Sequence, residues 1–265
     1  MMRASAILTL ALSSLAFTPP AALAQGVTGL LNGGTRLGPD TLQGAAPYGN
    51  PILDNRIYAH AYLDQFEGRL GSESYFRYDG QAWIGDDYNK LWLKSEGRYN
   101  ADNRGRFSDG DHEALYARPI STYFDMQVGV RSDIDSLRNR TWAAFGVQGL
   151  AIGFWNLELT GYASDNGRFA FRGNASYDLY LTQRLILQPQ IEMNAYSKAD
   201  RGRELGSGVS DIDMGLRMRY EFTREVAPYV GVSYQQFLGG TADYRRRSGE
   251  GSGDLRALAG LRLWY

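Results

Sequence analysis

From residue 56 to the end of the chain, hydrophobic and polar residues alternate with a period of two. In the segment "SDIDMGLRMRYEF" (210–222), Arg217 and Arg219 fall on one side, and Leu216 and Met218 fall on the other. Because the side chains of a strand point alternately to its two faces, this pattern predicts strands that separate an apolar from a polar environment. We expect twelve strands, at 56–67, 74–85, 90–99, 112–119, 123–132, 140–150, 154–164, 168–181, 184–197, 209–222, 227–238 and 254–265.

The connections between these segments alternate in length. The short ones are 86–89, 120–122, 151–153, 182–183 and 223–226, and the long, polar ones are 100–111, 133–139, 198–208 and 239–253. Two further connections, near 68–73 and 165–167, are short although they fall on the long-loop side. A soluble β-sandwich would share the alternation of side chains, but short turns facing longer loops are typical of outer-membrane barrels.

Aromatic residues gather beside the short turns: Tyr88, Tyr123, Phe124, Phe154, Trp155, Tyr229, Trp264 and Tyr265. Such a collar is also typical of outer-membrane barrels, and an even number of strands places both chain ends on the short-turn side. The sequence therefore predicts an all-β fold. We expect a transmembrane outer-membrane β-barrel of about 12 antiparallel strands, with short periplasmic turns and longer extracellular loops.

The free energy needed to place a charged side chain in lipid decides which side of each strand faces the membrane. An Arg or Lys side chain on the lipid face destabilises a barrel by about 2–4 kcal/mol at mid-membrane. We therefore expect the alternate residues that include Arg217 and Arg219 to face the lumen. The final segment, with Leu261, Leu263 and Tyr265 on its apolar side, looks like the carboxy-terminal signal that the barrel assembly machinery reads. It must pair with the first strand, because an unpaired backbone edge is not tolerated in lipid.

The amino-terminal residues indicate export. Residues 1–24 have a basic start, an apolar run and small residues before Gln25, which predicts a cleavable signal peptide. Residues 25–55 are rich in Gly, Pro and Asn and predict an irregular periplasmic arm before the barrel at 56–265. We therefore expect the cell outer membrane of a Gram-negative type of cell, with outer-membrane lipid as a partner.

The overall composition excludes several classes of site. With 28 basic and 29 acidic residues, the chain has no bulk attraction to nucleic acid. It has no cysteine, and therefore no disulfide, thiolate metal site or thiol nucleophile. The sequence also lacks a GxSxG elbow, an HExxH motif and a Walker loop. We expect a protein without enzymatic activity. An outer-membrane hydrolase that uses His60 or His112 stays open as an alternative.

The lumen-facing parity carries both signs of charge. Its acidic residues are Asp64, Asp79, Glu96, Asp125, Glu158, Asp178, Glu192, Asp213 and Glu221. Its basic residues are Arg77, Lys94, Arg98, Arg118, Arg131, Arg172, Arg217, Arg219, Arg256 and Arg262. These groups could form a self-neutralising network of salt bridges, or the acids could line a path for cations. His60 would face the lumen, and His112 would end a long polar loop.

Several segments of the barrel resemble the copper resistance protein B family of outer-membrane proteins. They include "YLDQFEGR" (62–69), "RTWAAFGVQGLA" (140–151), "LTQRLILQP" (181–189) and "LAGLRLWY" (258–265), in the same order as in the family. The resemblance implies a barrel that serves copper homeostasis together with periplasmic copper-handling proteins. The residues that match acidic positions in the family are Asp64, Glu96, Asp125, Glu158, Asp178, Glu192 and Asp213.

One departure from the family bears on how copper would be held. Members often carry a segment rich in Met and His before the barrel, whereas residues 25–55 contain neither. Thioether and imidazole groups hold copper tightly, so we expect a copper ion to be held weakly, by His60 and the carboxylates. The sequence predicts a barrel that passes or hands over copper ions through an acid-lined lumen. The alternative is an unselective small-solute pore or a plugged structural barrel without metal preference.

Overall fold

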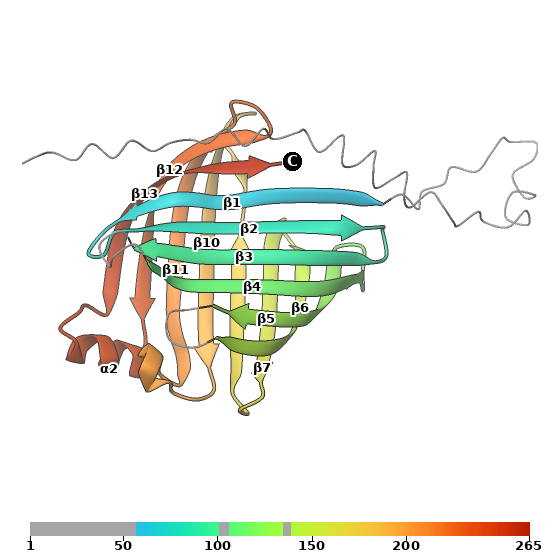
Figure 1. The fold of residues 1–265 in the computed structure, drawn as a ribbon. Helices are drawn as coiled ribbons and strands as arrows, with labels where there is room; N and C mark the ends of the chain where they lie inside the picture. Colours follow the sequence, from blue (N-terminus) through green and yellow to red (C-terminus); the bar gives the residue numbers. More distant parts are fainter. Residues whose placement is uncertain (1–56, 101–105, 135–138) are drawn as a thin grey trace, which may run out of the picture. The chain divides into compact units, whose positions relative to one another are not determined.

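The computed structural model describes residues 57–100, 106–134 and 139–265. They form one antiparallel sheet that closes on itself as a barrel (Figure 1). Its strands are β1 (Tyr58–Leu70), β2 (Tyr75–Gly85), β3 (Lys90–Asn100), β4 (Arg106–Pro119), β5 (Phe124–Asp133), β6 (Arg140–Ala151), β7 (Trp155–Ser164), β8 (Phe169–Ser176), β9 (Leu179–Tyr180), β10 (Leu185–Tyr196), β11 (Gly208–Tyr220), β12 (Val226–Phe237) and β13 (Gly253–Trp264). The two-residue β9 continues β8 along β10, so the barrel has twelve strands. The predicted signal peptide (1–24) and arm (25–55) lie outside the described residues.

The barrel closes where the last strand pairs with the first. Trp264 of β13 lies opposite Tyr62 of β1, and the pairing continues as far as Ala257 opposite Leu70. On its other side β13 pairs with β12. Each described strand apart from the two-residue β9, which pairs only with β10, therefore has two neighbours, and the barrel has no open edge strand along its length. The predicted antiparallel barrel is confirmed.

A β-bulge in β1 changes which residues face the lumen. The pairing of β1 with β2 shifts between Leu63 and Gln65, so Asp64 is an extra residue in the strand. Before the bulge the even-numbered residues point inward, and after it the odd-numbered residues do, including Glu67 and Arg69, which are buried. A bulge places two residues opposite one and so reverses the alternation along the rest of the strand.

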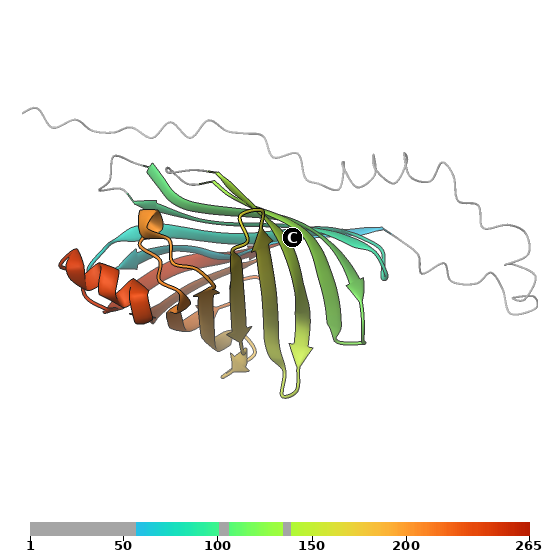
Figure 2. The same cartoon turned by 90° about the horizontal axis from the view of Figure 1, so that it is seen from below.

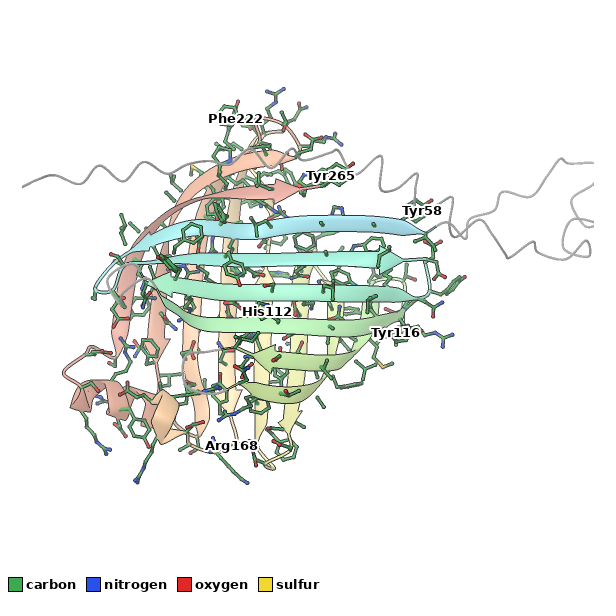
Figure 3. The ribbon with its side chains drawn as sticks, viewed as in Figure 1. Tyr58, His112, Tyr116, Arg168, Phe222 and Tyr265 are labelled. Atoms are coloured by element: carbon green, nitrogen blue, oxygen red, sulfur yellow. The ribbon has the colours of Figure 1, made fainter. Side chains whose placement is uncertain are left out.

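The pairings of β3 with β4 and of β10 with β11 also contain a register shift near the long loops. Elsewhere the strands show the predicted facing. On β11, Arg217 and Arg219 are buried in the lumen, whereas Leu216 and Met218 are about two-fifths exposed on the outer wall. Figure 3 shows Tyr58, Tyr116, Phe222 and Tyr265 on the short-turn side, and Arg168 at the opposite end. Tyr229 is an exception in the predicted aromatic collar, because it is buried in the lumen.

Arginine at Leu216 is expected to destabilise the folded barrel by about 2–4 kcal/mol, the cost of this side chain at mid-membrane on a lipid face. The matched control is Leu255→Arg, at the third residue of β13 beside the long loops, where the cost falls to about 0–1 kcal/mol. Urea titration of the barrel in phospholipid vesicles measures both free energies of unfolding. Equal losses at the two positions would contradict the assigned depth.

Three features differ from the expected elements. The expected strand 112–119 begins earlier, at Arg106, so His112 lies within β4 and not at the end of a loop. Arg118 falls on the outward parity of β4, because the buried residues Leu115 and Ala117 point inward. The expected loop 239–253 contains a short helix, α2 (Gly239–Arg247). None of the described helices has the length and apolar character needed to span a bilayer.

The short turns are fixed by their own side chains. In four of them a side-chain oxygen accepts a hydrogen bond from the backbone N–H three residues later: Asp86 from Asn89, Ser121 from Phe124, Thr182 from Leu185 and Thr223 from Val226. Such residues favour turns because they replace a backbone partner. Backbone hydrogen bonds from Asn89 and Tyr88 also lower the pKa of the Asp86 carboxyl.

Two of the described loops at the opposite end of the barrel contain short helices. α2 and a short 3-10 turn, η2 (Arg201–Arg203), lie together there (Figure 2). Thr241 of α2 joins them, because its Oγ1 accepts the backbone N–H of Gly206 at 2.8 Å and lies 2.9 Å from Ser210 Oγ. The long-loop side is therefore built up over β11.

Asp200 ties neighbouring loops together at this end. Its Oδ2 forms salt bridges with Arg140 Nη2 at 2.7 Å and with Arg168 Nη1 at 2.9 Å. Burial opposes ionisation of Asp200, but the hydrogen bond from Arg140 and the charges of both arginines outweigh it and lower the pKa of this carboxyl. A lowered pKa means that the stabilisation is present above the usual pKa of Asp and is lost only under more acidic conditions.

Candidate functional site in the lumen

A chain of salt bridges crosses the lumen on the long-loop side of the bulge. We call it the charged network. Its basic members are Arg69, Arg77, Arg131, Arg172, Arg203 and Arg217, and its acidic members are Glu67, Glu96, Asp111, Asp133, Glu192 and Asp213. The six arginines balance the six carboxylates, so the network has no formal net charge.

Glu67 is the most enclosed member of the charged network. Its side chain is fully buried and accepts Arg69 Nε at 2.7 Å and Arg217 Nη2 at 3.0 Å on Oε1. Its Oε2 accepts Arg217 Nε at 3.0 Å and the hydroxyl of Tyr229 at 2.9 Å. Four charge-assisted hydrogen bonds from three strands compensate the loss of water around this carboxylate.

Arg77 connects the two walls of the barrel. Its Nη2 lies 2.6 Å from Glu96 and 2.8 Å from Glu192, and its Nη1 lies 3.8 Å from Asp213. Glu96 continues the chain to Arg172, at 3.3 Å. Removing the Arg77 guanidinium would therefore leave buried carboxylates on three different strands short of a cationic partner.

The charged network fills this level of the lumen. Glu67, Arg69, Arg77 and Arg217 are each at most 3% exposed, although all four point toward the barrel interior. Glu96, Asp111 and Arg172 keep 16–17% of their side-chain surface exposed. Paired charges therefore occupy this level of the lumen, in the arrangement that the self-neutralising alternative predicts.

A vestibule lies on the short-turn side of the network. It is a cavity of about 500 Å³, and its titratable lining residues are His60, Tyr62, Asp64, Asp79, Glu158, Arg219, Glu221, Arg224 and Arg262. Glutamine and asparagine side chains supply much of the remaining wall. Some lining residues, including Ala227 and Trp264, lie at strand ends beside the short turns.

Aromatic rings hold the imidazole of His60 in the vestibule. Its centroid lies 5.6 Å from Trp264, 5.7 Å from Tyr62 and 6.3 Å from Trp83. Tyr62 is itself fixed by its hydroxyl, which donates to Gln81 Oε1 at 2.7 Å. The ring of His60 therefore has restricted freedom beside the cavity.

The carboxylates of the vestibule differ in their partners. Asp64 forms a salt bridge with Arg262, with 2.9 Å between Oδ1 and Nε. Glu158 forms one with Lys94, with 2.6 Å between Oε1 and Nζ. Asp79 makes no hydrogen bond or salt bridge with the part of the chain that the structure describes. Asp64 and Asp79 lie on neighbouring strands at one level, because Gln65, next to Asp64, is the cross-strand partner of Asp79. Two carboxylates side by side favour the presence of a cation.

The predicted metal candidates do not form one row. His60, Asp64 and Glu158 line the vestibule, and Glu96, Glu192 and Asp213 belong to the charged network. The other two pair elsewhere, Asp125 with Lys90 at 2.8 Å and Asp178 with Arg219 at 3.1 Å. Among the described residues, no three Asp, Glu or His side chains lie close enough together to hold a metal ion.

The predicted salt-bridge partners lie mostly where the charged network is. Arg131, Arg172 and Arg217 are members of it. Arg219 lies beside the vestibule, and the Arg98 guanidinium lies 5.5 Å from the ring centre of Tyr75.

The sequence alone did not identify five members of the charged network. Glu67 was hidden by the bulge, which leaves no signal in the alternation itself. Arg69, Asp111, Asp133 and Arg203 fell in expected loops, because the polar ends of β1, β4 and β5 resemble loop sequence.

The chain is similar to known copper resistance proteins over most of its length. A family model described as copper resistance protein B precursor (CopB) matches residues 57–265. Copper resistance protein B of Escherichia coli is 41% identical over 218 residues, which cover 82% of this chain and 73% of that protein. A copper resistance protein B homolog of Pseudomonas syringae pv. tomato (strain ATCC BAA-871 / DC3000) is 40% identical over 218 residues, which cover 82% of this chain and 73% of that protein.

Among solved structures, the chain is similar to two porins. The NanC porin aligns with a TM-score of 0.49 and 12% identity, covering 78% of this chain and 99% of that chain. The KdgM porin aligns with a TM-score of 0.44 and 13% identity, covering 78% of this chain and 98% of that chain.

Proposed function

This chain belongs to the copper resistance protein B family, and on that premise we propose that it serves copper resistance by holding copper ions weakly in the vestibule. The observation that carries the proposal is the pair Asp64 and Asp79, which face one cavity from neighbouring strands. Both carboxylate oxygens of Asp79 are available to contact a cation.

The donor set fits weak and reversible binding of a copper ion. Carboxylate oxygens and one imidazole, His60, are available in the vestibule, and the chain has no thiolate. Copper prefers nitrogen and sulfur donors, so a site dominated by oxygen holds it loosely and lets it leave. Water would have to complete the coordination.

The side on which the vestibule opens suggests a direction of exchange. In outer-membrane barrels the short turns face the periplasm. With the barrel in the cell outer membrane, the vestibule would exchange copper ions with periplasmic copper-handling proteins. The charged network would close it from the outside, so handover on the periplasmic side is favoured over free passage through the lumen.

A plugged structural barrel without metal preference is the second candidate. The observation in its favour is that seven predicted metal carboxylates all have a cationic partner: Asp64, Glu96, Asp125, Glu158, Asp178, Glu192 and Asp213. In that case Asp79 would make no difference to copper binding, and the two candidates separate in a single experiment.

Neutralising both vestibule acids, Asp64→Asn with Asp79→Asn, is expected to weaken Cu(II) binding on the order of tenfold, because two charges next to the ion are lost. Titration of the refolded full chain with Cu(II), followed by electron paramagnetic resonance, measures the affinity. Asp125→Asn is the control, since it removes a carboxylate charge outside the vestibule, and it is expected to leave the affinity unchanged. Unchanged affinity in the double variant would sink the proposed site.

A further inference from the structure

One positive charge of the vestibule is held at a single point. Arg262 of β13 forms the salt bridge with Asp64, but the geometry between its Nε and Oδ1, 2.9 Å apart, is not that of a hydrogen bond. Nη1 and Nη2 of Arg262 make no hydrogen bond or salt bridge within the described residues. The Arg262 and Asp64 side chains are 28% and 22% exposed, and both line the cavity. A partly exposed pair with one contact stabilises the fold little, so it can be exchanged for another pair.

The other cation that pairs with a vestibule acid is fixed. Lys94 Nζ donates to Glu158 at 2.6 Å, and it also donates to Gln127 at 2.9 Å and to Gln148 at 2.8 Å. All three N–H groups of this ammonium are therefore used, and Glu158 keeps its partner. Of the two paired acids that line the described vestibule, Asp64 is the one whose partner can be displaced.

A cation that binds between Asp64 and Asp79 meets Arg262. An ion in contact with the Asp64 carboxylate would lie next to the guanidinium, and like charges at such a short distance repel strongly where little water separates them. Arginine cannot relieve this repulsion by losing its proton, because it stays protonated at every physiological pH. Arg262 must therefore move away from Asp64 before a metal ion can use that carboxylate.

Glu221 is placed to receive the displaced guanidinium. It lines the same cavity, and its carboxylate makes no hydrogen bond or salt bridge with the described residues. On β12, Ala227 is the direct neighbour of Arg262. Tyr229, two residues further along β12, is the neighbour of Arg219, which lies two residues before Glu221. The same register therefore places Glu221 beside Ala227. Arg262 and Glu221 are then two strands apart, about 10 Å, and their long side chains can span this distance over the methyl group of Ala227.

We propose that Arg262 is a tethered counter-ion that a copper ion displaces from Asp64, and that Glu221 receives the displaced guanidinium. The inference rests on the proposed copper site and assigns the residue that sets its affinity. Without the metal, Arg262 neutralises Asp64. When the metal binds, one salt bridge replaces another, and when the metal leaves, Arg262 returns to Asp64. The site therefore holds copper more weakly than two free carboxylates would, which suits handover to a periplasmic protein.

Titration of the refolded full chain with Cu(II), followed by electron paramagnetic resonance, tests the role of Arg262. Arg262→Gln removes the competing charge and is expected to tighten Cu(II) binding about tenfold. A substitution that only damaged the fold would lower the affinity, so a gain identifies the competitor. Arg262→Lys keeps a tethered positive charge and is expected to bind Cu(II) about as tightly as the wild type. Arg184→Gln, at an exposed arginine beside a short turn and outside the vestibule lining, is the control and is expected to change nothing.

A double-mutant cycle tests the role of Glu221. Glu221→Gln removes the receiving carboxylate, so displacement of Arg262 becomes less favourable, and Cu(II) binding is expected to weaken about three- to fivefold. In the Arg262→Gln background the same substitution is expected to have no effect, because Glu221 acts through Arg262. Equal losses in both backgrounds would mean that Glu221 attracts the ion directly, and would overturn the exchange.

The failure of this inference differs from the failure of the proposed copper site. Equal Cu(II) affinity in the wild type and in Arg262→Gln would overturn the role of Arg262 and leave the copper site standing. Absence of Cu(II) binding in both proteins would overturn the copper site itself. Equal tightening in Arg184→Gln and Arg262→Gln would mean that the overall charge of the barrel sets the affinity, and would overturn the displacement from Asp64.

Discussion

Replacement of Arg77 by methionine is expected to destabilise the folded barrel by about 3–5 kcal/mol, the cost of breaking a buried salt bridge from one side. Methionine keeps most of the bulk and removes only the charge. Glu192 then loses its salt bridge, Glu96 keeps only Arg172, and Asp213 keeps only Arg69. Urea titration in phospholipid vesicles measures the difference in the free energy of unfolding.

The matched control for Arg77→Met is Arg246→Met. Arg246 also forms a salt bridge, with Asp243 at 3.4 Å, but its side chain is 63% exposed on α2. An exposed pair of this kind contributes about 0–1 kcal/mol, so the control is expected to change stability little. A loss in Arg77→Met as small as in the control would mean that water reaches the charged network and that the lumen is not plugged there.

The barrel itself could be predicted from the sequence because each strand must solve the same problem. An outer wall in lipid and an inner wall of paired charges impose one strict alternation, which Leu216 and Arg217 illustrate on β11. Register between strands then follows from the short turns, where Asp86 and Thr182 fix the chain. The polar strand ends, such as the start of β4 at Arg106, could not be predicted in this way, because they resemble loop sequence.

The lumen site could be predicted only in part, because alternation gives the facing of a residue and not its partner. Most lumen acids could be recognised from their position in the alternation along each strand. The pairing of each carboxylate with a particular arginine depends in addition on the tilt and stagger of the strands. Glu67 shows the limit most clearly, since the bulge at Asp64 reverses which residues face the lumen without any mark in the hydrophobic pattern.

Liposomes that contain the wild-type barrel are expected to admit neither Cu(II) nor Mg(II) nor a neutral sugar above the level of empty liposomes. The reason is the charged network, whose central members are buried and paired across the lumen. Entry of metal ions is followed with an indicator dye inside the liposomes, and entry of sugar by osmotic swelling. Wild-type liposomes that admit all three would establish an unselective pore.

The paired variant Arg77→Ala with Arg172→Ala is expected to open the lumen to cations. It removes two bulky side chains and both cationic partners of Glu96, and it leaves Glu192 without its salt bridge. Unpaired carboxylates in a narrow passage concentrate cations, so metal ions should enter faster than a neutral sugar, on the order of tenfold or more. Arg262→Ala, in the vestibule wall, removes one positive charge without opening the network, and this variant is expected to stay closed.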